Sequence, residues 1–84
     1  MVTRTKSALD KALVEAHKAG DKSEIARLYE EVGNVFEADG DVDGAAFYLT
    51  HAYVFALEIG SSRADQLQER LHRLGREVPP SKKL

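Results

Sequence analysis

The chain has 84 residues, of which 43 % are apolar and 31 % are charged, proportions that fit one small globular domain and exclude a disordered chain. The net charge of −2 argues against a general nucleic-acid binder, because neutralising phosphates needs a surplus of basic residues. The lack of cysteine excludes a disulfide framework and a thiolate metal site. No segment approaches the roughly 18 apolar residues of a membrane span, and no apolar signal segment follows the first residues. We therefore expect a cytoplasmic protein with no membrane or nucleic-acid partner.

Three glycines, Gly20, Gly40 and Gly60, divide the chain at regular intervals. Each suits the left-handed position that ends a helix, and a capping residue for the next helix follows each one. The candidate caps are Asp21 or Ser23, Asp41 or Asp43, and Ser61 or Ser62. These signals predict helices at residues 6–19, 22–39, 42–59 and 62–76. Connections this short force neighbouring helices to run antiparallel.

The first, second and fourth of these helices each carry one apolar stripe with three- and four-residue spacing. The stripes contain Leu9, Ala12, Leu13 and Ala16; Ile25, Leu28, Tyr29, Val32 and Phe36; and Ala64, Leu67, Leu71, Leu74 and Val78. The last stripe also has the spacing of a coiled-coil seam. Pro79 and Pro80 end the fourth helix. We predict an all-α fold of four antiparallel helices, with one domain over residues 1–78 and a disordered basic tail over residues 79–84.

The helix at 42–59 differs from the others because residues 44–57 contain no Asp, Glu, Lys or Arg. One of its faces carries Ala45, Tyr48, Leu49, Ala52, Ala56 and Ile59. Phe47, His51 and Val54 fall on the opposite face. Two interpretations stay open: the helix is the centre of the bundle, or Phe47, His51 and Val54 form an exposed patch for self-association, which would make a homodimer.

Small and aromatic residues are spaced in a recognisable way along the second and third helices. The residues concerned are Tyr29, Val32, Gly33, Phe36, Gly40, Asp41, Ala45, Leu49 and Ala52. At these places the tetratricopeptide repeat family favours an aromatic, a Leu-Gly pair, an aromatic, Gly-Asp, Ala, an aromatic and Ala, so residues 26–59 resemble one such helical hairpin. Leu49 departs from the favoured aromatic. Leu57 replaces the usual proline, which predicts a longer second helix.

The resemblance implies a scaffold that binds a peptide or helix in a groove lined by the first helix of the repeat. It places Arg27, Glu30, Asn34 and Glu37 on that surface, although the same four residues also fit a solvated helix face. The resemblance thus predicts a protein-interaction module, an adaptor or assembly factor, with a protein or peptide partner. The alternative is a structural homo-oligomer or a subunit of a larger helical complex, for which the fourth helix would supply the seam.

Motifs for catalysis or cofactor binding are weak. Residues 39–44 match the start of an EF-hand loop, but Thr50 stands where calcium needs a bidentate glutamate. His17, His51 and His72 are never three or four residues apart, as ligands on one helix would be. Neither a nucleophile with a placed histidine nor a phosphate-binding glycine loop is present. The sequence therefore predicts no enzyme, no cofactor and no metal site.

Overall fold

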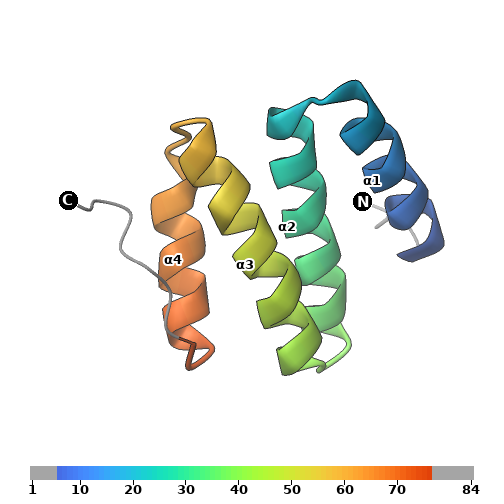
Figure 1. Cartoon of the computed structure of the whole chain (residues 1–84). Helices are drawn as coiled ribbons and strands as arrows, with labels where there is room; N and C mark the ends of the chain where they lie inside the picture. Colours follow the sequence, from blue (N-terminus) through green and yellow to red (C-terminus); the bar gives the residue numbers. More distant parts are fainter. Residues whose placement is uncertain (1–5, 77–84) are drawn as a thin grey trace.

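The computed structural model describes residues 6–76, which form four helices joined by short turns (Figure 1). The helices are α1 (Lys6–Ala19), α2 (Lys22–Ala38), α3 (Val42–Glu58) and α4 (Arg63–Arg73). No strand occurs in these residues, so the all-α prediction is confirmed. The first three helices match their predicted ranges to within one residue, whereas α4 ends three residues before the predicted position 76. The predicted tail at 79–84 lies outside the described residues.

The turns use the glycines and two of the caps that the sequence indicated. The backbone of Gly40 has a φ of 81°, a conformation that a side chain would strain, and Gly20 and Gly60 are similar. Asp21 accepts a hydrogen bond from the Glu24 backbone N–H at 3.1 Å, and Asp41 accepts one from the Gly44 N–H at 2.9 Å. These two aspartates are therefore the N-caps of α2 and α3.

The two ends of α4 depart from the sequence signals. Ser62 precedes α4 but its side chain makes no capping hydrogen bond. Instead the hydroxyl of Ser61 accepts from the backbone N–H of Arg63 at 3.1 Å. The helix ends before Gly75, which has a φ of 81°, rather than at the prolines further on. A fourth glycine thus terminates a helix in the same way as the other three.

The helices stand in a row in chain order, and each packs against its neighbours in the sequence (Figure 1). Within residues 6–76 the backbone of α1 approaches only that of α2, and the backbone of α4 approaches only that of α3, while α2 and α3 share the most extensive contact. The molecule is accordingly flat, with extents of 37 × 31 × 20 Å. None of its described helices has the length and apolar character to cross a membrane.

The core consists of two apolar clusters that meet near Tyr29. The first, from α1 and α2, contains Leu9, Leu13, Ala16, Ile25, Leu28 and Val32. The second, from α3 and α4, contains Ala46, Leu49, Ala52, Tyr53, Ala56, Ala64, Leu67 and Leu71. Tyr29 packs against both clusters, and its burial, with a smaller effect of Tyr48, raises the pKa of its phenol. Tyr29 therefore links the two halves of the molecule.

Two glycines allow α2 and α3 to approach closely. A Cβ atom on Gly33 would lie 2.7 Å from Cγ of Leu49, which is fully buried. A Cβ atom on Gly44 would lie 2.6 Å from Cδ1 of Phe36. Both distances are far below a normal van der Waals contact. Each glycine is consequently required by packing and not by its backbone conformation.

We expect Gly33→Ala to lower the free energy of unfolding by about 1–2 kcal/mol, because the new methyl group overpacks the contact with Leu49. The loss should occur although alanine is the better helix former by about 1 kcal/mol. Thermal unfolding followed by circular dichroism measures it. Asn34→Ala is the matched control, since Asn34 is the next residue on α2 and is exposed. A Gly33→Ala variant that melts at or above the wild-type temperature would contradict the close packing.

Candidate protein-interaction site

A groove with a volume of about 520 Å³ runs between α2 and α4 over the end of α3. We call it the α2–α4 groove. Its lining residues are Ser23, Ala26, Arg27, Glu30, Glu31, Asn34, Ala56, Ile59, Ser61, Arg63 and Leu67. The apolar part comprises the buried Ala26, Ala56 and Leu67 together with Ile59, which is 40 % exposed. The groove thus combines an apolar floor with polar and charged walls.

Arg27 and Asn34 lie on the exposed surface of α2 and line this groove. The Arg27 guanidinium donates to Glu24 at 3.1 and 2.5 Å and lies 3.6 Å from a carboxylate oxygen of Glu31. The hydrogen bonds with Glu24, and the charges of Glu24 and Glu31, raise the pKa of Arg27 despite its partial burial. The side chain of Asn34 makes no hydrogen bond within residues 6–76. Its amide therefore has donors and an acceptor free for a ligand.

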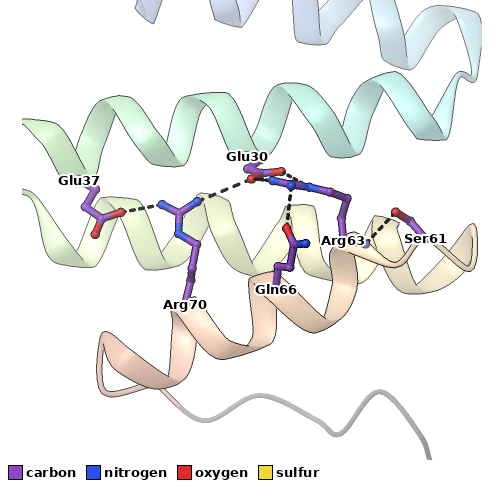
Figure 2. Close-up of polar contacts among 6 residues, drawn as sticks. All are labelled: Glu30, Glu37, Ser61, Arg63, Gln66 and Arg70. Carbon is purple, nitrogen blue, oxygen red and sulfur yellow. Dashed lines mark hydrogen bonds and ion pairs between the residues drawn. The ribbon is translucent and has the colours of Figure 1, made fainter.

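Two glutamates of α2 pair with two arginines of α4 (Figure 2). Glu30 accepts from the Nε of Arg63 at 3.2 Å and from its Nη2, and it lies 3.7 Å from Arg70. Glu37 accepts from Arg70 at 2.6 Å. We call these four residues the α2–α4 ion pairs. They connect helices that share no direct backbone contact in the described residues.

The register of these ion pairs follows from helix geometry. Glu30 and Glu37 are seven residues apart, as are Arg63 and Arg70, and seven residues make about two helical turns. Since α2 and α4 are separated by one antiparallel helix, they run in the same direction and keep this register. The side chain of Glu30 is 14 % exposed, which reduces the screening of its charge by solvent. Glu30 is therefore the central member of the set.

The four residues that the sequence predicted for partner binding do not all lie in the same place. Arg27, Glu30 and Asn34 line the α2–α4 groove, whereas Glu37 lies outside it and is held by Arg70. The interpretation of all four as one solvated helix face does not describe Glu30, which is largely covered. Sequence reasoning missed Arg63, which also lines the groove. The sequence does contain a signal for Arg63: an arginine follows 33 residues after each of the two glutamates, in the Glu30–Arg63 and the Glu37–Arg70 pair.

Phe47, His51 and Val54 lie on the opposite side of this arrangement, and Phe47 and Val54 are 58 % and 43 % exposed. The interpretation that places Phe47 and Val54 inside the bundle is wrong, because both side chains are exposed, whereas His51 is half-buried. A second groove of about 520 Å³ lies between α1 and α3, and Phe47 and His51 line it. Its lining residues are Asp10, Leu13, Val14, His17, Lys18, Tyr29, Phe47, Tyr48 and His51.

Aromatic rings form the floor and wall of this second groove. The ring of His51 stacks on Tyr29 with centroids 5.1 Å apart and meets Phe47 edge to face at 4.7 Å. His17 lies 3.3 Å from the Tyr29 hydroxyl and packs edge to face on Phe55. Two histidines far apart in the sequence thus surround one tyrosine. Within residues 6–76 no three His, Asp or Glu side chains are placed to hold a metal ion.

The EF-hand-like residues 39–44 have a different role in the structure. Asp41 caps α3, and Gly44 lies within the first turn of that helix, where the Phe36 ring packs against it. Gly44, the sixth residue of the EF-hand-like segment, therefore serves the packing of α3 against Phe36 rather than the turn of a calcium loop.

Comparison of the chain with protein-family models, with curated proteins and with solved structures finds no significant match. The resemblance of residues 26–59 to a tetratricopeptide repeat therefore stays a prediction from the sequence. The structure independently provides an antiparallel α2–α3 hairpin with Gly33 and two buried alanines, Ala45 and Ala52, in these residues.

We expect Glu30→Gln to lower the free energy of unfolding by about 1 kcal/mol, because the amide keeps the shape of Glu30 but loses the charge that faces Arg63 and Arg70. Thermal melts at low salt measure the loss. At about 1 M salt, where the Debye length is near 3 Å, the difference from wild type should narrow. Glu15→Gln, at an exposed position without an ion pair in residues 6–76, is the control. Equal melting of both variants would show that the α2–α4 ion pairs contribute nothing to stability.

Proposed function

We propose that the chain is a protein-interaction module of the tetratricopeptide type that binds a peptide or helix of a partner protein in the α2–α4 groove. The observation that carries the proposal is the groove itself, with its apolar floor and the unpaired amide of Asn34 on its wall. Such a combination suits a peptide, which offers apolar side chains and backbone polar groups together. The proposal includes a cytoplasmic location and no catalytic activity.

The apolar floor and the polar walls of the groove contact different groups of the ligand. Ile59 and the alanines of the floor accept an apolar side chain of the ligand, and this burial supplies the hydrophobic part of the affinity. Asn34 donates to and accepts from the ligand backbone. Arg27 is fixed by Glu24 and Glu31, so it offers a charged donor whose side-chain entropy is already reduced.

The second interpretation, a subunit of a larger helical complex joined through the fourth helix, receives less support. The apolar residues Ala64, Leu67 and Leu71 of α4 are buried within this chain, and Leu74 packs beside them. The exposed positions of α4 are Arg63, Asp65, Gln66, Glu69, His72 and Arg73. A helix with a polar outer surface ends a row of helices instead of extending it.

A random peptide library displayed on phage and selected against the whole chain tests the proposal. We expect selected peptides whose affinity, measured by fluorescence anisotropy, falls by about tenfold or more for the double variant Arg27→Ala/Asn34→Ala. Both residues are exposed, so the melting temperature should change little.

Lys11→Ala is the control variant, because Lys11 is an exposed residue of α1 that does not line the groove. It should bind the selected peptides as the wild type does. Failure to select any peptide, or selected peptides that bind the double variant with unchanged affinity, would sink the assignment of the α2–α4 groove.

A further inference from the structure

A second surface of the molecule, formed by α1 and α3, exposes large apolar side chains on both helices. Val14 of α1 is 47 % exposed, and Phe47 of α3 is 58 % exposed, and both line the groove above Tyr29. We call this surface the α1–α3 face and define it by Asp10, Val14, Lys18, Phe47, His51 and Val54. It shares no residue with the α2–α4 groove.

The two helices of the α1–α3 face run in the same direction. Asp10, early in α1, lies in a pocket with Tyr48, which is early in α3. His17, late in α1, packs on Phe55, which is late in α3. Each helix contributes a stripe of three residues to this face: Asp10, Val14 and Lys18 on α1, and Phe47, His51 and Val54 on α3. The residues of the α1 stripe are four residues apart, and those of the α3 stripe are four and three residues apart, so each stripe lies on one face of its helix.

The charges on the α1 stripe are complementary to those of the same stripe turned end to end. Asp10 is negative and Lys18 is positive, each is four residues from Val14, and neither has an ion pair within residues 6–76. A second α1 laid antiparallel on the first would place each Asp10 opposite the Lys18 of the other copy. Val14 would then meet its own counterpart at the centre.

The α3 stripe is also complementary to a second copy of itself turned end to end, but through apolar side chains instead of charges. Antiparallel pairing of two α3 helices centred on His51 places each Phe47 opposite the Val54 of the other copy, so large apolar side chains meet on both sides. Residues 44–57 contain no Asp, Glu, Lys or Arg, so α3 loses no hydration of charged groups in such a contact. The acidic residues beyond the stripe, Asp43 and Glu58, already pair with Arg76 and Lys22.

We infer that two copies of this chain associate through their α1–α3 faces about a two-fold axis that passes between the two Val14 and the two His51 residues. Both stripes are self-complementary under the same operation, which is the requirement of an isologous dimer interface. Phe47 and Val54 form the apolar anchors of the interface. The paired Asp10 and Lys18 at its rim set the antiparallel direction.

The mass in solution over a hundredfold dilution, measured by sedimentation or light scattering, gives the first test. We expect a mass that approaches twice 9.3 kDa at the highest concentration and falls on dilution. Phe47→Glu and Val54→Glu should each raise the dissociation constant by about tenfold or more, because each puts a charge in an apolar contact. Both should keep the wild-type circular dichroism, since the side chains are exposed in the single chain.

Val42→Glu is the matched control, because Val42 is 45 % exposed but lies about 180° from His51 around α3. Its dissociation constant should equal that of the wild type. Phe47→Glu should also bind any peptide of the α2–α4 groove normally, so that loss of the dimer and loss of peptide binding are separate results.

A charge exchange tests the two-fold arrangement directly. Asp10→Lys alone places two lysines against each other at each end of the paired α1 helices, and Lys18→Asp alone places two aspartates there, so each should weaken the dimer. The double variant Asp10→Lys/Lys18→Asp restores opposite charges and should recover the wild-type dissociation constant. A wild-type chain that stays at 9.3 kDa throughout, a dimer unaffected by Phe47→Glu, or a double variant that does not recover would each overturn the inference.

Discussion

The close contact between α2 and α3 is the constraint on which the rest of the structure depends. Gly33 removes a side chain opposite the buried Leu49, and Gly44 removes one opposite Phe36. The outer helices contact this hairpin from its two sides and do not contact each other within residues 6–76. In a row of helices of this kind most of the stability comes from contacts between neighbouring helices. The central contact therefore determines where α1 and α4 are placed.

The row of helices also leaves two gaps, one between α1 and α3 and one between α2 and α4. α2 and α4 flank α3 on one side of the molecule, and the α2–α4 ion pairs span the distance between them (Figure 2). α1 and α3 flank Tyr29 in the same manner, and there the gap is lined by aromatic rings. One gap is bridged by charges and the other is not. This difference gives the two surfaces different chemistry although the helix arrangement that creates them is the same.

Most of the local structure could be predicted from the sequence, because helix ends are governed by a few residues. Gly20, Gly40 and Gly60 together with Asp21 and Asp41 placed the first three helices to within one residue. The predicted end of α4 at residue 76 is three residues too late, because Gly75 ends the helix before the prolines are reached. All of these signals act within one turn of the chain, where no tertiary information is needed.

The surfaces could be predicted less well, since exposure depends on how many neighbours a helix has. A helix such as α3, with no charged residue over 44–57, has no polar face to mark its outside. Only the row arrangement, in which α2 and α4 cover two sides and leave the third open, decides that Phe47 and Val54 are exposed. In the same way, the pattern of α2 alone marked Glu30 and Glu37 as surface residues. Their pairing with Arg63 and Arg70 depends on the placement of α4.

The two proposed surfaces use different faces of α2, which has a consequence for a dimer. Arg27 of the α2–α4 groove and Tyr29 below the α1–α3 face are two residues apart, so their side chains leave the helix about 160° from each other. A dimer joined through the α1–α3 face therefore directs its two α2–α4 grooves outward and leaves both accessible. Two grooves on one particle bind a partner with two copies of the recognised segment more tightly than either groove alone, by effective concentration and without any new contact.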